Sequence, residues 1–352
     1  MKEFYGAQEA KKVAGVAILL MLIHHLFTYS DWLVDGCVVD SVFGPLVNKA
    51  VWLIGRLGNI CIYVFAFSSG YVLWRRWNLF DTWGKRLRRI LDFLTGYWVV
   101  CVLFLAVAWL SGDTLPAPRT ALANAFGLGT TVHRPEVNVV FAWYVFYYIV
   151  FVLVSPVLYR AMQRGPLQDA AVVCAVALLM CANTAWLGGY FVPLLSGVLG
   201  ICVAKYDLFA KAENVAKSTG GGKILMLSGL LLMLAARTLV LALAMRFHGN
   251  GAAEAAVYMM EACIAAGFIY FTVKLLNLFD SRMLDSVLLF FGGISMTLWF
   301  VHGLAYTGSC HLQKLIYASS EPVVILLTAL AVFVPLSLAL TRLLPLFARK
   351  RK

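Results

Sequence analysis

The sequence is poor in charged residues. Only 13% of its 352 residues are Asp, Glu, Lys or Arg, whereas 62% are hydrophobic. A soluble domain carries about 25% charged residues, so this chain lacks the polar side chains that would cover a water-soluble surface. Apolar runs of about 20 residues recur along the whole length, which also excludes a soluble enzyme with one membrane anchor. The composition therefore predicts an all-α polytopic membrane protein.

The sequence also lacks the short motifs of several other protein classes. Its eight cysteines form no CxxC pair and no Cys/His cluster, so we expect no metal site. The Gly-rich stretch 218–222 lacks the Lys-Ser/Thr ending of a phosphate loop and is typical of a flexible connector. The first apolar run has no small-residue cleavage site behind it, so we expect a retained membrane span rather than a signal peptide.

Ten apolar runs are candidates for membrane helices in one domain, 1–352. We predict spans at approximately 13–29, 51–74, 90–111, 139–159, 168–186, 190–204, 224–246, 254–273, 285–305 and 323–346. The segment 112–138 contains three prolines and is too polar to span, so we expect it to cap the outer face.

The distribution of basic residues predicts the orientation. If the N-terminus is cytoplasmic, 22 of the 29 Lys and Arg lie in cytoplasmic segments and six in outer segments, with Arg237 inside a span. This asymmetry favours cytoplasmic N- and C-termini in a multi-pass protein of the cytoplasmic (plasma) membrane. It also accounts for the net charge of +12, so nucleic acid is not an expected partner. Cys37 and Cys310 fall in outer loops, where an oxidising compartment permits them to pair.

Histidines from two distant parts of the sequence are predicted to lie at similar depth. His24 and His25 are near the outer end of the first span, and His302 is near the outer end of the ninth. Imidazole takes and returns a proton near neutral pH, so a depth-matched set favours catalysis. The alternative is an interfacial histidine bonded to a backbone carbonyl or a lipid headgroup. Adjacent helical residues diverge by about 100°, so His24 and His25 cannot both face one pocket.

Two further sets of charged residues need an explanation. Arg237 and Glu261 lie near the middle of consecutive antiparallel spans, which favours an ion pair; alternatively, Arg237 binds a carbonyl or phosphate group of a polar substrate. The basic stretch 85–89 opens the third span, where Arg86 and Arg89 share a helix face with a spacing suited to binding phosphates. Asp92 follows on that face, where it can orient Arg89.

Several segments, taken in order, resemble the acyltransferase-3 family of integral membrane acyltransferases. They are the His-His run 15–27, the Phe-rich Ser-Gly-Tyr segment 65–71, the Arg-x-x-Arg segment 86–90, and the segments 143–145, 155–158, 197–205 and 294–302. The resemblance extends from residue 9 to 346. It implies a ten-helix bundle that moves an acyl group, usually acetyl, from cytoplasmic acyl-CoA to a hydroxyl or amine of an extracytoplasmic acceptor. That acceptor is commonly a cell-surface carbohydrate or a lipid-linked glycan. Acyl-CoA is a co-substrate, and no tightly bound cofactor is implied.

The resemblance also implies roles for individual residues. His25 takes the position of the essential His in the family's Arg-x10-His motif, but Ala14 stands at the Arg position, where Lys11 or Lys12 can supply a cation. His25 is expected to act as a general base or to carry the acyl group transiently, and the adjacent His24 is the alternative candidate for this role. His302 completes the expected catalytic set and, with Arg237, is expected to position the acceptor or the thioester. The expected phosphate-binding residues are Arg86, Arg89, Lys85 and Lys12, and the expected substrate-binding residues are Arg237, Glu261, Tyr144 and Trp143.

Two other classes of protein stay open. A transporter or flippase for a polar or anionic solute fits Arg237, Glu261 and the basic inner segments. A non-catalytic scaffold or lipid-binding subunit leaves the histidines inside the spans unexplained.

Overall fold

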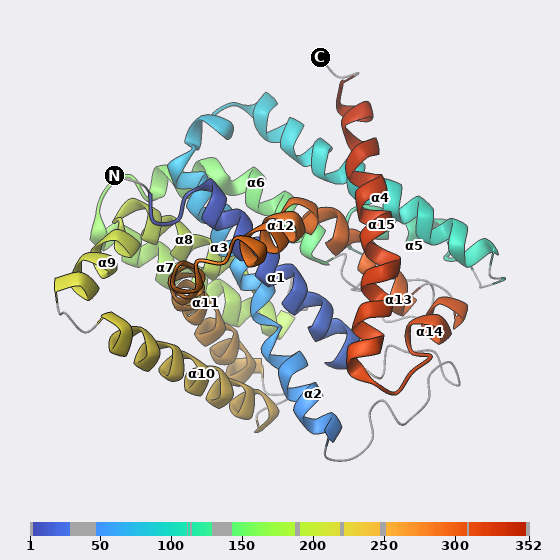
Figure 1. Ribbon diagram of the computed structural model, residues 1–352. Coiled ribbons are helices and arrows are strands. Elements are labelled where there is room, and N and C mark those ends of the chain that lie inside the picture. The colour runs from blue at the N-terminus through green and yellow to red at the C-terminus, as the bar shows by residue number, and fades with distance from the viewer. Residues whose placement is uncertain are drawn as a thin grey trace. The chain divides into compact units, whose positions relative to one another are not determined.

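The computed structural model describes residues 3–28, 47–110, 112, 115–128, 143–186, 191–218, 222–246, 251–307 and 310–349, and within these ranges it contains no strand. Figure 1 labels the helices along the chain. They are α1 (Ala7–Thr28), α2 (Val47–Leu57), α3 (Ile60–Arg75), the 3-10 helix η3 (Trp77–Leu79), α4 (Trp83–Leu110), α5 (Pro118–Ala125), α6 (Trp143–Ala161), α7 (Pro166–Trp186), α8 (Leu194–Lys205), α9 (Leu208–Ser218), α10 (Gly222–Arg246), α11 (Gly251–Phe279), α12 (Arg282–His302), α13 (Leu304–Thr307), α14 (Cys310–Ile316) and α15 (Pro322–Arg349).

Eight stretches of helix among the described residues are long and apolar enough to cross a membrane. They begin at residues 7, 49, 83, 143, 226, 253, 282 and 322. Two shorter apolar helices, Pro166–Ala182 and Leu194–Lys205, coincide with the predicted spans 168–186 and 190–204. The all-helical, multi-pass architecture is therefore confirmed, whereas the count of ten spans and the cytoplasmic position of both termini stay predictions.

The structure differs from the predicted spans in its details. The predicted span 51–74 consists of two helices, α2 and α3, separated by a turn at residues 58 and 59. Within the predicted cap, the described residues form the short helix α5, which begins with a proline at its first turn, where the missing amide is tolerated. Cys37 lies outside the described residues, as does the side chain of Cys310, so their pairing stays a prediction.

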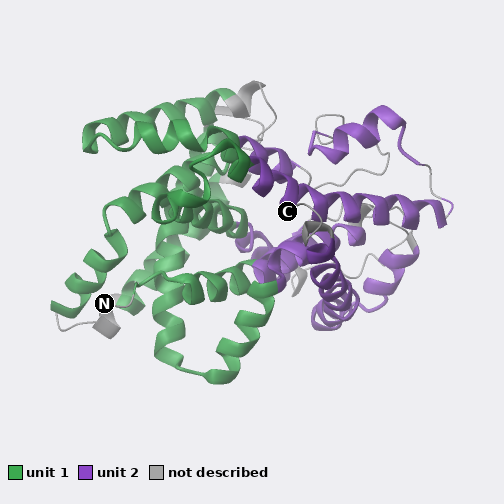
Figure 2. Ribbon diagram, turned by 90° about the horizontal axis from the view of Figure 1, so that it is seen from above, with its two compact units in different colours: residues 1–17, 60–86, 151–293 green, residues 18–59, 87–150, 294–352 purple. Residues whose placement is uncertain are grey.

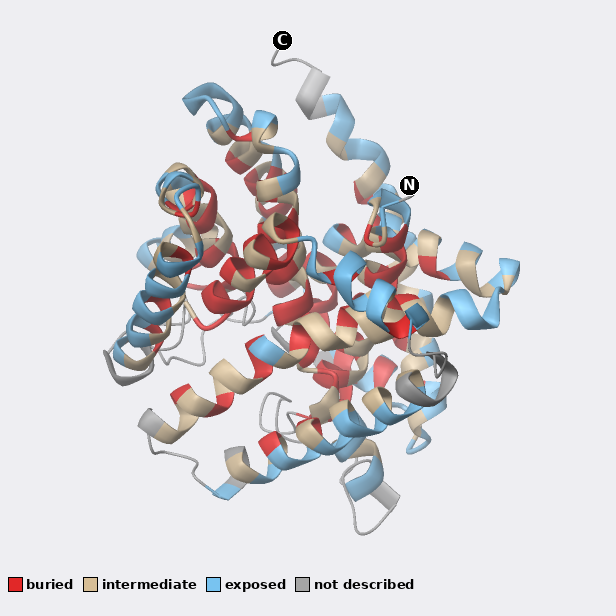
Figure 3. Ribbon diagram, turned by 90° about the vertical axis from the view of Figure 1, so that its left-hand side faces the viewer, coloured by how far each residue is buried: buried red, intermediate tan, exposed pale blue. Residues whose placement is uncertain are grey.

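The chain divides into two compact units (Figure 2). Unit 1 comprises Met1–Ala17, Ile60–Arg86 and Phe151–Gly293, and unit 2 comprises Ile18–Asn59, Leu87–Val150 and Ile294–Lys352. The long helices carry both buried and exposed residues (Figure 3), and many of the exposed residues are large and apolar. Such exposed apolar surface is expected where a helix faces lipid.

In unit 1, α3 packs against α8 with almost no space between the backbones. A Cβ atom added to Gly70 would lie 1.8 Å from the carbonyl oxygen of Gly197, and one added to Gly200 would lie 2.1 Å from the carbonyl oxygen of Phe67. The Ser196 hydroxyl donates to the carbonyl of Tyr63 at 2.8 Å. Small residues permit this approach, which drives helix association in membranes through van der Waals packing. The two segments 65–71 and 197–205, noted separately in the sequence, thus form one interface.

In unit 2, close backbone contacts also position the second half of α1. A Cβ atom at Gly58 would lie 2.4 Å from the carbonyl oxygen of Leu20, so the turn between α2 and α3 needs a glycine here. In the same unit, the hydroxyls of Thr297 and Thr341 lie 2.9 Å apart and join α12 to α15.

Candidate functional site

Two of the predicted histidines lie side by side in unit 2. His25 is on α1 and His302 is the last residue of α12. Nδ1 of His25 lies 3.0 Å from Nε2 of His302, and the two rings have centroids 4.8 Å apart and planes tilted by 20°. Both side chains are buried, with 8% and 1% of their surface exposed. The structure therefore joins two imidazoles that are 277 positions apart in the sequence.

Each imidazole of this pair has a second polar contact. Nδ1 of His302 contacts the carbonyl oxygen of Trp299. This carbonyl belongs to the last turn of α12, where helix geometry provides no intrahelical amide. Nδ1 of His25 lies 3.0 Å from Sδ of Met21, one turn earlier on α1. Sequence reasoning missed both contacts, although the i−4 spacing of Met21 from His25 was an available signal.

His24 faces a different neighbour. Its Nδ1 lies 2.9 Å from the carbonyl oxygen of Gly55 on α2 and 3.3 Å from the hydroxyl of Thr28. The side chain is buried, as is that of His25. The two adjacent histidines thus diverge, as helix geometry requires. His24 contacts a backbone carbonyl, whereas His25 contacts a second imidazole.

A tyrosine from a segment expected to be an outer loop fixes the same part of α1. The Tyr317 hydroxyl donates to the carbonyl oxygen of Leu26 at 3.0 Å, and both residues are buried. The two residues are 291 positions apart. No pattern in the sequence signals this contact.

The aromatic residues that open α6 pack next to the histidine-bearing end of α12. Tyr144 is buried and meets the Trp299 ring edge to face, with centroids 5.4 Å apart. Trp143 packs on Tyr144 at 5.9 Å and is half-buried. Because the Trp299 carbonyl is the partner of His302, Tyr144 supports the helix turn that holds this imidazole.

Arg237 and Glu261 pair with each other in unit 1. Nη1 of Arg237 on α10 contacts Oε2 of Glu261 on α11, and both side chains are buried. The ion pair favoured by their matched depth is therefore present. A buried charge needs such a partner, because an unpaired one is costly in hydrocarbon. Their predicted role in binding substrate is untested.

Lys12, one of the predicted donor-binding residues, pairs with Asp285. The Lys12 ammonium contacts the Asp285 carboxylate, and only 7% of the Lys12 surface is exposed. Close by, a Cβ atom at Gly15 would lie 2.2 Å from the carbonyl oxygen of Leu288, so the backbones of α1 and α12 almost touch. The Lys12 charge thus stabilises the packing of α1 on α12 within unit 1.

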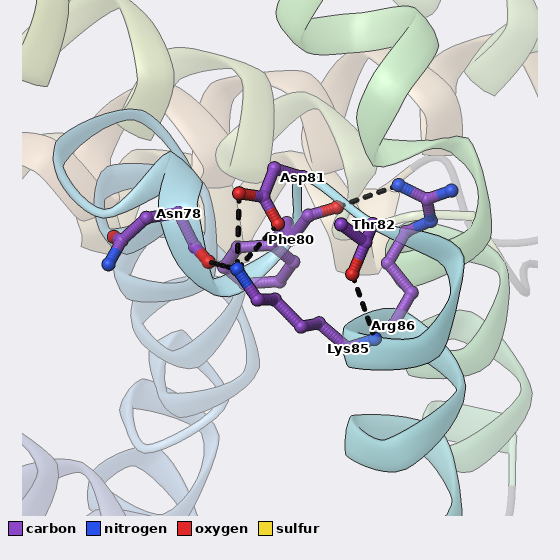
Figure 4. Close-up of polar contacts among 6 residues, drawn as sticks. All are labelled: Asn78, Phe80, Asp81, Thr82, Lys85 and Arg86. Carbon is purple, nitrogen blue, oxygen red and sulfur yellow. Dashed lines mark hydrogen bonds and ion pairs between the residues drawn. The ribbon is translucent and has the colours of Figure 1, made fainter.

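The basic residues that open α4 bind the turn that precedes it (Figure 4). Nζ of Lys85 lies 2.8 Å from the carboxylate of Asp81 and 2.8 Å from the carbonyl oxygen of Asn78. The pKa of Asp81 lies below its ordinary value, chiefly because the Lys85 ammonium donates a hydrogen bond to the carboxylate. Nη1 of Arg86 donates to the carbonyl oxygen of Phe80 at 2.7 Å.

The guanidinium of Arg86 has a further donor atom, Nε. This atom is buried and has no hydrogen-bond partner among the residues that the structure describes. A buried polar group normally has a partner, so this atom is a candidate for contact with an anionic ligand. Arg89, three residues further along α4, hydrogen-bonds the hydroxyl of Tyr148 in unit 2.

The fold and these contacts define a class, that of multi-pass helical membrane proteins with a buried imidazole pair. A comparison with protein families finds a match to a model described as an acyltransferase domain, that of acyltransferase family 3, over residues 15–342. The chain belongs to this family and is a membrane acyltransferase, which confirms the resemblance seen in the sequence. Neither a comparison with curated proteins nor one with solved structures finds a match.

Proposed function

We propose that this protein moves an acyl group, most simply acetyl, from cytoplasmic acyl-CoA to a hydroxyl or amine of an extracytoplasmic acceptor. The acceptor class is cell-surface carbohydrate or lipid-linked glycan, and the site of action is the cytoplasmic (plasma) membrane. The observation that carries the proposal is the buried pair of His25 and His302 in a chain of the acyltransferase-3 family. A buried imidazole in a membrane helix is a candidate functional group because burial of a polar side chain there is costly.

His25 acts as the general base in this proposal. It takes the proton of the acceptor hydroxyl while the hydroxyl oxygen attacks the thioester carbonyl. The new C–O bond forms, the C–S bond breaks, and the departing CoA sulfur receives the proton from His25. In the alternative route, His25 itself attacks the thioester and carries the acyl group until the acceptor arrives. A burst of CoA release before acceptor is added would indicate the second route.

The CoA phosphates bind at the start of α4 in this proposal. Arg86 supports it, because its Nη1 binds the Phe80 carbonyl while its buried Nε has no hydrogen-bond partner among the described residues. Guanidinium groups suit phosphates because they present several N–H donors in one plane. Lys85 and Arg89 add positive charge on the same stretch of sequence. Lys12 contributes less, since its ammonium is paired with Asp285.

The test is acyl transfer by purified protein in lipid nanodiscs. Wild-type protein should release free CoA from acetyl-CoA and should be stabilised against heat by this ligand, because a ligand that binds only the folded state raises its stability. His25→Ala should lower the rate by about 10²–10⁴-fold, the usual contribution of a general base. His311→Ala is the matched control, because this histidine is exposed on α14.

The outcomes separate the candidate functions. If His25→Ala still transferred the acyl group to its acceptor at the wild-type rate, the assignment of His25 would be wrong. If wild-type protein neither released CoA nor was stabilised by acetyl-CoA at any concentration, the transport of a polar or anionic solute would become the better explanation.

A further inference from the structure

The contacts of the histidine pair determine where the ring protons lie. Nδ1 of His302 faces the Trp299 carbonyl oxygen, which can only accept a hydrogen bond. Nδ1 of His302 therefore carries a proton. In the neutral ring, Nε2 of His302 is then an acceptor, because each neutral imidazole has one N–H and one lone pair.

The same reasoning applies to His25. Its Nδ1 lies 3.0 Å from Nε2 of His302, an acceptor, and 3.0 Å from Sδ of Met21, which is also an acceptor. Both neighbours therefore require a proton on Nδ1 of His25. The three contacts agree on one arrangement, in which His25 donates to His302 and His302 donates to the Trp299 carbonyl.

We propose that His302 is a positioning residue that fixes the tautomer of His25, so that the reactive lone pair of His25 lies on Nε2. This inference rests on the proposed function, in which His25 is the base. His302 touches neither the donor nor the acceptor in this scheme. It acts through His25, as a buried carboxylate acts through the histidine of a Ser-His-Asp triad.

A neutral orienting group suits a membrane site. A carboxylate in this position would have to be buried as an ion, which is costly in hydrocarbon, whereas imidazole can accept the same hydrogen bond without a charge. When Nε2 of His25 takes the acceptor proton, the resulting cation keeps its Nδ1–H bond to His302. That bond becomes charge-assisted and therefore stronger at the moment when positive charge develops.

The C-terminal end of α12 makes this arrangement rigid. His302 is the last helical residue, so its imidazole can turn back to the Trp299 carbonyl three residues earlier. Tyr144 packs on the Trp299 ring and restrains the same turn. In this proposal, His302 and Tyr144 therefore act through His25 instead of contacting the substrate.

Two substitutions distinguish a positioning role from other roles of His302. In His302→Gln, the side-chain carbonyl oxygen can accept the Nδ1–H of His25 but cannot take up a proton. We expect this variant to stay within roughly ten-fold of the wild-type turnover. In His302→Leu, the strong acceptor is lost and only the weak thioether acceptor of Met21 remains, so the Nδ1–H tautomer of His25 is no longer enforced. We therefore expect turnover to fall by about 10²–10⁴-fold with an unchanged KM for acetyl-CoA. His311→Gln is the control.

A spectroscopic measurement tests the tautomer without relying on activity. With ¹⁵N-labelled histidine in nanodiscs, the six histidines are few enough for His25 to be assigned from the loss of its signals in His25→Ala. Wild type and His302→Gln should show the proton on Nδ1 of His25, and His302→Leu should shift it to Nε2 or to a mixture. This result is readable even if acetyl-CoA proves not to be the donor.

Three results would overturn the inference. One is a wild-type His25 that carries its proton on Nε2. Another is His302→Leu protein that keeps wild-type turnover and the wild-type tautomer. The third is His302→Gln protein that is folded, keeps the Nδ1–H tautomer and is as inactive as His302→Leu, because His302 would then have to transfer a proton itself. Heat stability of each variant verifies folding.

Discussion

The ion pair of Arg237 and Glu261 offers a prediction whose size follows from its burial. The side chains are 5% and 8% exposed, and they join α10 to α11 inside unit 1. Replacing Arg237 alone by Met leaves the Glu261 carboxylate buried without its cation. Loss of one partner of a buried pair costs about 3–5 kcal/mol. Replacing both by Met and Leu removes the two charges together, and such exchanges are often neutral.

The assay is thermal unfolding of purified variants in one detergent, arranged as a double-mutant cycle. For a chain of 352 residues, a loss of 3–5 kcal/mol corresponds to a melting temperature lower by roughly 4–7 °C. We therefore expect Arg237→Met and Glu261→Leu each to melt well below wild type, and the double variant to melt higher than either. Arg246→Met is the matched control, since this arginine is exposed at the end of the same helix.

Two results would count against this reasoning. If a single variant melted at the wild-type temperature, the pair would not stabilise the fold as its burial implies. If the double variant were as unstable as the sum of the two singles, the side chains would act independently of each other. Acyl transfer by a stable double variant then tests whether the pair also binds substrate. Retained activity assigns the pair to packing, and lost activity assigns it to substrate binding.

Three further substitutions test other contacts. Gly70→Ala should lower stability by about 1–3 kcal/mol or more, because its Cβ would lie 1.8 Å from the Gly197 carbonyl oxygen; an unchanged melting temperature would show that α3 and α8 can separate freely. Lys12→Met should lower the free energy of unfolding by no more than about 3–5 kcal/mol, because the Asp285 carboxylate is 31% exposed and can be hydrated once its cation is gone. Adding Asp285→Asn to Lys12→Met should restore part of the lost stability. Lys85→Ala should change the free energy of unfolding by less than about 1 kcal/mol, because the Lys85 side chain is 49% exposed. It should raise the KM for acetyl-CoA roughly two- to five-fold. An unchanged KM would show that Lys85 does not belong to the donor site.

The sequence predicts the helices better than it predicts their partners. Long apolar runs predict ten spans, and eight of them match stretches of helix among the described residues that are long and apolar enough to cross a membrane. The break between α2 and α3 is different, since it depends on Gly58 approaching the Leu20 carbonyl of another helix. Likewise, Gly70 and Gly197 are visible in the sequence as small residues, but nothing in either segment says that the two meet. Contacts between distant segments depend on the packing of the whole bundle.

The candidate site shows the same division between what is local and what is not. The order and direction of the spans were enough to predict that His25 and His302 lie at similar depth, but not that the two imidazoles meet. The sequence does not say which of His24 and His25 faces the other imidazole, since this depends on which neighbour lies on each side of α1. His24 meets the Gly55 carbonyl of α2, and His25 meets His302.

Partner chemistry then separates the buried polar groups by the kind of role they can have. Arg237 with Glu261 and Lys12 with Asp285 are pairs of opposite charge, which are suited to holding helices together while both groups stay ionised. His25 with His302 is a pair of groups that are both able to gain and lose a proton. An ion pair loses its attraction when a proton neutralises one of its partners. When an imidazole pair takes up a proton, its hydrogen bond is kept and becomes charge-assisted. Of these three pairs, only the histidines can therefore accept a substrate proton and keep their hydrogen bond to each other.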